Sequence, residues 1–324
     1  MPSVLTLVDI LKRTEQLFAT KGIDSARLDA ELLLAHALDL DRVQLYVEFS
    51  RPLEEEELAK LRPLVRRRAN REPVAWITGT KGFYSIDLAV HRDVLVPRPD
   101  TELLVEQALA LLPMDDEMFV ADVGTGTGAV GLAIAKERPR AKIYATDVSD
   151  AALQCAQANV ASLDLSKRVA VLKGSLLEPI PEHRPIDIVV SNPPYIATPI
   201  LDSLEPEVRD HEPRLALDGG TDGLDIYRAL IGQALRRAKH AVLMEIGHDQ
   251  GAAIQQLFTQ HMTEGAVSLF KDLAGRDRVV CWKRHPSAKK DTPATGEIEL
   301  VLEPENKPVY DPDAPVTLEM EQEG

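Results

Sequence analysis

The stretch MFVADVGTGTGAVGLAIAKE, residues 118–137, decides the fold of this chain. Its first part, 118–123, is an apolar segment typical of a buried strand, and its last part, 129–137, has the composition of a buried helix. Three glycines at alternate positions, from Gly124 to Gly128, separate the two and let the backbone turn sharply close to a ligand. This order of strand, glycine-rich turn and helix predicts a nucleoside-type cofactor at the helix N-terminus.

Strand and helix patterns alternate through the rest of this region. Such alternation predicts an α/β fold with a mostly parallel, seven-stranded, Rossmann-like sheet covered on both faces. The last two strands lie too close in sequence for a helical crossover, so one of them should run antiparallel. The predicted strands are 118–123, 141–147, 168–172, 186–191, 241–247, 266–272 and 278–282, and the predicted helices are 129–137, 150–163, 222–238 and 250–260.

The chain divides into four predicted parts. Residues 1–75 predict a small helical bundle, 76–96 a β-hairpin linker, and 97–285 the α/β domain. Residues 286–324 hold ten acidic residues, three lysines and six prolines, a composition that predicts a disordered tail.

Two helices stand out in the predicted bundle. The helix at 25–40 should bury one apolar stripe, and the helix at 53–71 should be kinked or interrupted at Pro63. We interpret the arginines of the second helix as a solvated face. The stripe comprises Leu28, Leu32, Ala35 and Leu38, and the arginine run comprises Arg66, Arg67, Arg68 and Arg71.

Composition excludes several classes of protein. The 324-residue chain has a net charge of −15, which argues against wrapping nucleic acid through a broad basic surface. No apolar run approaches the roughly 20 residues that a membrane span needs, and residues 1–16 acquire charges too early for a secretory signal. Cys155 and Cys281 lack metal-site spacing, so we expect reduced thiols and no metal. A cytoplasmic protein is expected.

An acidic residue follows the predicted cofactor loop at a spacing typical of ribose binding. Asp147 ends the strand 141–147, nineteen residues after Gly128. A carboxylate at this place can accept hydrogen bonds from both hydroxyls of a ribose. The spacing of Gly124, Gly126 and Ala129 also fits the looser dinucleotide pattern, so these residues leave the identity of the cofactor open.

The strand 186–191 stops at Asn192–Tyr195, with sequence NPPY. Two consecutive prolines end a strand because neither has an N–H for the ladder. Alone, the motif predicts only a turn. In a doubly wound sheet, however, the strands 118–123 and 186–191 are neighbours across the switch point, so the motif should lie beside the glycine loop.

A turn of this composition can hold a planar –NH₂ group, which is a poor nucleophile because its lone pair is delocalised. The side-chain oxygen of Asn192 and the carbonyl of Pro193 would accept its two hydrogens and align the nitrogen with an electrophile. The proline rings would keep that carbonyl aimed. Tyr195 offers a flat face over the group and a barrier to water. Asn192, Pro193 and Tyr195 are therefore the predicted catalytic residues.

These motifs together resemble those of the amino-methyltransferases that use S-adenosylmethionine. Within that group, the chain is similar to the peptide chain release factor N5-glutamine methyltransferases over roughly residues 5–284. The segments that carry the resemblance are DAELLLAHAL (29–38), VLVPRPDTELLVEQAL (94–109), EPRLALDGGTDGLDIYR (212–228), EIGHDQG (245–251) and DLAGRDRVV (272–280).

The resemblance implies a Rossmann-like class I methyltransferase domain that methylates the glutamine of the Gly-Gly-Gln loop of release factors, with the helical domain gripping the release factor. It implies cofactor contacts from Gly124, Thr125, Gly126, Thr127, Gly128 and Asp147, with Leu176 packed on the adenine ring. The glutamine amide would bind Asn192, Pro193, Pro194 and Tyr195, and Asn192 would also touch the adjoining cofactor. Arg98 and Glu102 should lie near the site, either in a direct role or in an ion pair that fixes the connector.

Two stretches depart from the family pattern. Members commonly carry Asp after the third strand, where this chain has Ser175 and Leu176, and the connector lacks a frequent EF-G pattern. The alternatives are a glutamine methyltransferase acting on a ribosomal protein, a DNA adenine methyltransferase, an NAD(P)-dependent oxidoreductase and a non-enzymatic adaptor. The net negative charge argues against a DNA adenine methyltransferase. An NAD(P)-dependent oxidoreductase would not explain the motif Asn192–Tyr195.

Overall fold

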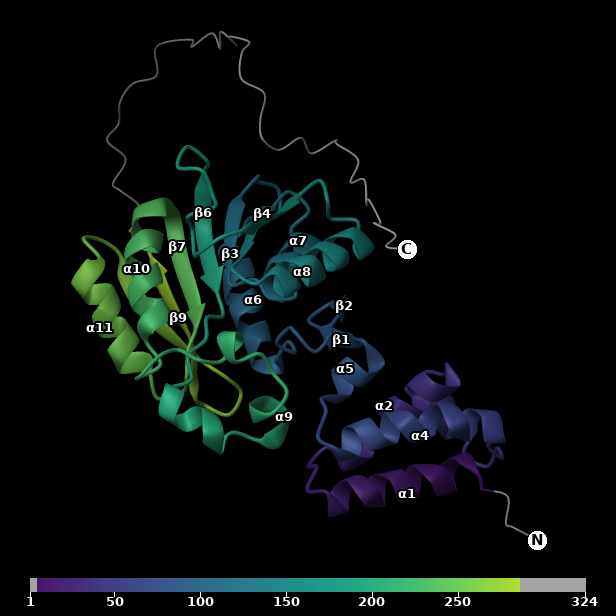
Figure 1. Cartoon of the computed structure of the whole chain (residues 1–324). Coiled ribbons are helices and arrows are strands. Elements are labelled where there is room, and N and C mark those ends of the chain that lie inside the picture. The colour runs from purple at the N-terminus through teal and green to yellow at the C-terminus, as the bar shows by residue number, and fades with distance from the viewer. Residues whose placement is uncertain (1–4, 286–324) are drawn as a thin grey trace, which may run out of the picture.

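The computed structural model describes residues 5–285, and the predicted tail at 286–324 lies outside them. A helical N-terminal part lies beside a larger body built on a twisted sheet, and a short connector joins the two (Figure 1). None of the helices within the described residues has the length and apolar content that crossing a bilayer requires.

The N-terminal part packs its helices around their own apolar core. Side chains such as Leu7, Phe18 and Leu45 are fully buried there. The fourth helix continues through Pro63 as one element, so the predicted interruption is absent from it. The helices are α1 (Leu7–Thr20), α2 (Ala26–Leu38), α3 (Arg42–Val47), α4 (Glu55–Ala69) and α5 (Val74–Thr78).

The buried face of α2 differs from the predicted stripe. Leu28 is 42% exposed, whereas Leu33 and Leu34 are fully buried. Consecutive leucines place apolar side chains around most of this helix, so spacing alone does not single out one face. Two acids, Asp29 and Glu31, are also buried, and both form ion pairs with arginines.

Those ion pairs correct the interpretation of the arginine run as a solvated face. Arg68 is only 4% exposed, and its Nε lies 2.6 Å from Asp29 Oδ2. Glu207, in α9 (Pro206–Arg209) of the larger body, accepts from Arg68 Nη2 at 2.9 Å and from Arg71 Nη2 at 2.6 Å. We call Asp29, Arg68, Arg71 and Glu207 the interdomain ion cluster. It joins α4 to the larger body.

The connector contains the predicted β-hairpin. Strands β1 (Thr80–Phe83) and β2 (Ile86–Ala89) pair antiparallel, which confirms that part of the prediction. The chain before them is helical, because α5 continues to residue 78 and ends at Gly79 with a φ of +78°.

The larger body contains the predicted sheet. Within residues 5–285 its strand order is β5-β4-β3-β6-β7-β9-β8. Strand β9 pairs antiparallel with both β7 and β8, and the other neighbouring strands pair in parallel. This confirms the mostly parallel, seven-stranded prediction. The strands are β3 (Phe119–Val123), β4 (Lys142–Asp147), β5 (Val169–Lys173), β6 (Ile186–Ser191), β7 (Ala238–Glu245), β8 (Ala266–Lys271) and β9 (Asp277–Lys283).

Helices cover both faces of this sheet. Alternate residues of each buried strand point to opposite faces, so Val120 packs in the core with α6 and α7, and Ala121 in the core with α10 and α11. The remaining elements are η1 (Pro99–Thr101), α6 (Glu102–Leu109), α7 (Ala129–Glu137), α8 (Asp150–Ser162), η2 (Thr198–Ser203), η3 (Arg214–Ala216), α10 (Asp225–Arg237) and α11 (Gly251–His261).

Candidate active site

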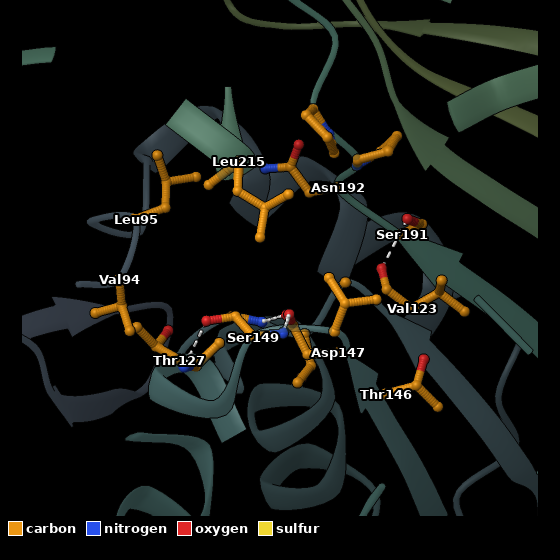
Figure 2. Close-up of a pocket in the computed structure, with 18 of the residues that line it drawn as sticks. Val94, Leu95, Val123, Thr127, Thr146, Asp147, Ser149, Ser191, Asn192 and Leu215 are labelled. Atoms are coloured by element: carbon orange, nitrogen blue, oxygen red, sulfur yellow. Dashed lines mark hydrogen bonds between the residues drawn. The ribbon is translucent and has the colours of Figure 1, made fainter. Parts of the chain in front are cut away.

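A cavity of about 250 Å³ lies at the carboxyl ends of the parallel strands. Figure 2 shows Asn192 and Leu215 on one side of it and Asp147 and Ser149 on the other. Strands β3 and β6 are adjacent, and Ser191 Oγ donates to the carbonyl of Val123 at 2.8 Å, which joins the two sides. The predicted residues that line the cavity are Gly124, Thr125, Gly126, Thr127, Asp147, Leu176, Asn192, Pro193 and Pro194.

The three loop glycines have different tasks. All adopt left-handed backbone angles, with φ of +69° at Gly124, +57° at Gly126 and +86° at Gly128. A Cβ built on Gly124 or Gly126 would meet no heavy atom of the described chain within 4 Å, and both residues border the cavity. A Cβ on Gly128 would lie 2.7 Å from Leu132 Cδ1. Gly128, which is not in the cavity lining, therefore lets the loop close onto α7.

Asp147 ties the end of β4 to this loop. Its Oδ2 accepts from the N–H of Gly126 and its Oδ1 from the N–H of Ser149, both at 2.9 Å. A carboxylate oxygen can accept more than one hydrogen bond. Asp147 can therefore shape the loop and still accept from the hydroxyls of a bound ribose.

Asp122 is a loop-fixing residue that the sequence interpretation missed. It is 1% exposed and accepts hydrogen bonds from Thr125 Oγ1 at 2.6 Å and from the N–H of Gly131 at 3.0 Å. Burial raises the pKa of its carboxyl to about 6. The sequence does carry a signal for this role, because Asp122 is an acidic residue in an otherwise apolar strand, just before the glycine loop.

The loop after β5 also reaches the cavity. Leu176 lines the cavity with a φ of +52°, and its carbonyl accepts from Thr146 Oγ1 at 2.8 Å. Ser175 lines the cavity as well. An apolar side chain is therefore available to pack on a flat ring, without the Asp that the family commonly carries.

On the opposite side, Asn192 is held by a residue far away in the sequence. Its Nδ2 donates to Oγ1 of Thr101, 91 residues earlier, at 3.0 Å. Among the described residues, no donor forms a hydrogen bond with Asn192 Oδ1. The side-chain oxygen is therefore free to accept a hydrogen bond from a ligand.

Two glycines and a glutamine lie against the backbone carbonyls of the Asn192–Tyr195 turn. A Cβ on Gly223 would lie 2.3 Å from the carbonyl oxygen of Tyr195, and a Cβ on Gly219 would lie 2.8 Å from that of Pro194. Gln250 Nε2 donates to the Tyr195 carbonyl at 2.9 Å. The segments 212–228 and 245–251, noted above for their resemblance, thus have a packing role here.

Tyr195 lies outside the cavity lining. Its hydroxyl is 3.5 Å from Oε1 of Glu245, and burial raises its pKa to about 12. In this arrangement the ring packs behind the turn, and its predicted role over the substrate amide stays a prediction.

Arg98 and Glu102, both predicted to lie near the site, make different contacts. Arg98 lines the cavity and pairs through Nη2 with Oε2 of buried Glu212 at 2.5 Å. Glu102 accepts from the N–H of Tyr84, in the turn of the hairpin, at 3.0 Å. Arg98 therefore borders the cavity, and Glu102 fixes the connector.

Glu245 is a second functional candidate that the sequence interpretation missed. It ends β7 beside Asn192 and is 1% exposed. Burial raises the pKa of its carboxyl to about 7, and hydrogen bonding to Thr101 is the largest effect opposing that rise. A group that titrates near neutrality at the edge of a cavity is typical of functional sites.

Comparisons with known proteins show which proteins this chain is similar to. The chain matches the family models of the PrmC N-terminal domain over residues 9–79 and of the methyltransferase small domain over 99–202. Relatives named release factor glutamine methyltransferase come from Geobacter sulfurreducens, 43% identical over 86% of this chain and 97% of the relative, and from Caulobacter vibrioides, 44% identical over 87% and 98%.

Among solved structures, the hMettl16 catalytic domain in complex with a MAT2A 3'UTR hairpin superimposes with a TM-score of 0.51 and 16% sequence identity. The likeness covers 64% of this chain and 78% of that one. At this identity it establishes the fold alone, and it agrees with the methyltransferase-type sheet described above.

Proposed function

The chain belongs to the family of release factor glutamine methyltransferases, and on that premise we propose that it transfers a methyl group from S-adenosylmethionine to a glutamine side-chain amide of a peptide chain release factor. The observation that carries the proposal is the cavity in which a free amide oxygen, on Asn192, lies across from the glycine loop and Asp147.

The residues of the glycine-loop side fit a nucleoside cofactor. Gly124 and Gly126 leave space that any Cβ would occupy, Asp147 can accept from ribose hydroxyls, and Leu176 offers an apolar surface for adenine. When bound, S-adenosylmethionine supplies a methyl group on a sulfonium sulfur, and its transfer to the glutamine nitrogen leaves S-adenosylhomocysteine and releases a proton.

The residues of the opposite side orient the acceptor. Asn192 Oδ1 and the carbonyl of Pro193 accept the two hydrogens of the glutamine –NH₂ and hold its nitrogen toward the methyl group. As the nitrogen gains positive charge in the transition state, both oxygens stabilise it. No strong base is required, because an N-methylated amide cation readily loses its proton.

The proposed substrate segment is the Gly-Gly-Gln loop. Leu95 and Leu215 line the cavity, and Leu215 is 62% exposed, so an incoming chain meets apolar side chains. Two glycines before a glutamine add no side-chain bulk and allow close approach of the backbone. Contact between the helical N-terminal part and the release factor, the remaining assigned site residues and a cytoplasmic location all belong to this proposal.

A labelling experiment tests the proposal. The protein is incubated with methyl-labelled S-adenosylmethionine and purified release factor, ribosomal proteins or DNA, and the label is located by mass spectrometry. We expect label on the glutamine of the Gly-Gly-Gln loop, and none when Gln is replaced by Asn in that loop. Label on a ribosomal protein glutamine would identify the related enzyme instead, and label on DNA or on no glutamine would refute the proposal.

A further inference from the structure

The segment that follows the acceptor motif leaves the cavity and returns to it. Residues 197–218 form a loop whose two ends are tied together, and we call it the acceptor strap. The N–H of Ile196 donates to the carbonyl of Leu217 at 3.0 Å, and the N–H of Gly219 donates to the carbonyl of Ile196 at 2.8 Å. Near the returning end, Leu215 lines the cavity on the acceptor side (Figure 2). The strap is therefore part of the cavity wall.

The far end of the strap lies away from the sheet. It contains α9, on the side of the larger body that faces the N-terminal part (Figure 1). None of the four residues of α9 is buried, so packing in the core of the larger body does not fix its position. Polar contacts with the N-terminal part take over this role, and they centre on Glu207.

Arg68 is fixed inside the N-terminal part and extends one donor to the strap. Its Nε donates to Asp29 Oδ2 at 2.6 Å and its Nη1 to the carbonyl of Glu72 at 3.2 Å. The remaining nitrogen, Nη2, donates to Glu207 Oε1 at 2.9 Å. The side chains of Arg68 and Asp29 are 5% and 4% exposed. Because breaking a buried ion pair is costly, this guanidinium favours a carboxylate at the position of Glu207.

Arg71 supplies a second guanidinium from a strained backbone. Its φ is +69°, a left-handed conformation that is unfavourable for a residue with a side chain. Its Nη1 donates to the carbonyls of Lys21 and Gly22, at 3.0 and 2.6 Å, and its Nη2 donates to Glu207 Oε2 at 2.6 Å. Each oxygen of Glu207 thus accepts from a different arginine, and both arginines are held by other contacts within the N-terminal part.

A second anchor lies between Glu207 and the cavity. Glu212, later in the strap, pairs with Nη2 of Arg98 at 2.5 Å. The chain from Glu207 to Leu215 is therefore held at its far end by the interdomain ion cluster and near the cavity by Arg98. Loss of the far anchor alone should loosen this part of the strap without releasing it.

We propose that Glu207 is a positioning residue: held by Arg68 and Arg71, it sets the position of the acceptor strap and so of the cavity wall at Leu215. The helical N-terminal part thereby acts on the reaction through the shape of the cavity. The identity of the acceptor rests on the proposed function. The position of Leu215 is a property of the chain, which can be measured without any substrate.

The first test needs no substrate. The methyl signals of Leu215 in the NMR spectrum of protein with labelled leucine methyl groups are assigned through their loss in Leu215→Ile. They should shift or broaden in Glu207→Gln, which removes the charge and keeps the shape. Asp210→Asn is the matched control, because this acid of the same strap pairs with the adjacent Arg209, and it should leave the Leu215 signals in place.

A buried leucine and a second variant guard against general unfolding. Leu243, fully buried in β7, should keep its methyl signals in both variants. If Glu207→Gln does not fold, Arg71→Gln replaces it, because that variant leaves the more buried pair of Arg68 and Glu207 intact. The Leu215 signals should shift in Arg71→Gln as well.

The second test measures transfer to intact release factor. Glu207→Gln should lower kcat/KM for the release factor about tenfold, since a small misplacement of a cavity wall disturbs the alignment of the acceptor. The Kd for S-adenosylmethionine should stay within about 3-fold, because the glycine-loop side, which aligns the methyl donor, is untouched. Asp210→Asn should leave both quantities unchanged.

A double variant shows whether Glu207 acts through Leu215. Leu215→Ala shortens the wall and should by itself lower kcat/KM about tenfold. Adding Glu207→Gln to Leu215→Ala should cause less than about 3-fold further loss, because residues that act through one another are not additive. Independent effects would multiply to about 100-fold and would overturn the proposal, since Glu207 would then act by another route.

The tests separate the possible failures. Unchanged Leu215 signals in the folded variant would overturn the positioning role, whatever substrate the enzyme uses. Shifted signals with unchanged kcat/KM would also overturn it, because the position of the wall would then not matter to the reaction. Native protein that leaves release factors unlabelled, while the Leu215 signals still depend on Glu207, would refute only the proposed function.

Discussion

The two sides of the cavity are built in different ways. The glycine-loop side is centred on the contiguous stretch 122–131, with Asp147 and Leu176 added from the segments that follow β4 and β5. Backbone N–H groups of that stretch donate to the carboxylates of Asp122 and Asp147. The acceptor side depends on side chains from remote segments, since Thr101 lies 91 residues from Asn192 and Gln250 lies 55 residues from Tyr195. The glycine-loop side should therefore tolerate most substitutions except those of its glycines and acidic residues. The acceptor side should be sensitive to substitutions in several segments that are distant in the sequence.

The largest expected effect separates the two sides. Asn192→Ala removes one of the two proposed acceptors for the substrate –NH₂, so methyl transfer should fall about 10²- to 10³-fold. Affinity for S-adenosylmethionine, measured by calorimetry, should stay within about 3-fold of the native value, since the glycine loop is untouched. A collapse of cofactor affinity would show that Asn192 belongs mainly to the cofactor side.

The second prediction concerns the support behind the turn. Gly223→Ala places a Cβ 2.3 Å from the Tyr195 carbonyl oxygen, at a φ of +77°. Overpacking and left-handed strain together should lower the free energy of unfolding by about 3 kcal/mol, measured by urea denaturation. Gly275→Ala is the control, because its φ of +78° is similar but a Cβ meets no described atom within 4 Å. Equal losses in both variants would show that strain alone is responsible.

The third prediction concerns pH. Burial raises the pKa of Glu245 from 4.5 to about 7, so the folded protein retains a proton that the unfolded chain releases. The stability from this group is complete below about pH 4.5 and is lost as the pH rises through 7. From pH 5 to pH 8.5 the native protein should therefore lose about 2–3 kcal/mol relative to Glu245→Gln, measured by urea denaturation at each pH. Parallel curves for the two proteins would contradict the raised pKa.

The smallest expected effect belongs to the glycine-loop side. Gly124→Ala places a Cβ in the space assigned to the cofactor, so the Kd for S-adenosylmethionine should rise about tenfold, or about 1.4 kcal/mol. At saturating cofactor, kcat should stay within about 3-fold, because Asn192 is unaffected. Gly275→Ala again controls for backbone strain and should leave the Kd unchanged. A fall in kcat without a change in Kd would reverse the assignment of the two sides.

The same contrast explains what could be predicted from the sequence. The strand, loop and helix around Gly124–Gly128 are contiguous, so their pattern predicts both the fold and the cofactor side. The motif Asn192–Tyr195 predicts the acceptor chemistry for the same reason. Thr101 and Glu245 escaped prediction because their contact with Asn192 exists only after the strands have paired.

Burial in the helical part shows a further limit of sequence patterns. The predicted α2 stripe was only partly right, because Ala35 is buried but Leu28 is exposed, and the consecutive leucines leave the buried face undetermined by spacing. A buried acid such as Asp29 is not indicated by any apolar pattern. Its partner Arg68 looks like a surface residue in a run of arginines. Only the fold reveals that opposite charges from separate segments neutralise each other there.

The interdomain ion cluster has a consequence for domain exchange between relatives. Glu207 lies in the segment that follows the acceptor motif, yet its arginine partners are Arg68 of α4 and Arg71 just after that helix, both in the N-terminal part. A chimera that imports a foreign N-terminal part inherits compatible charges only if residues 205–207 travel with it. The functional unit of recombination in this chain is therefore discontinuous, and its boundary does not coincide with the connector hairpin.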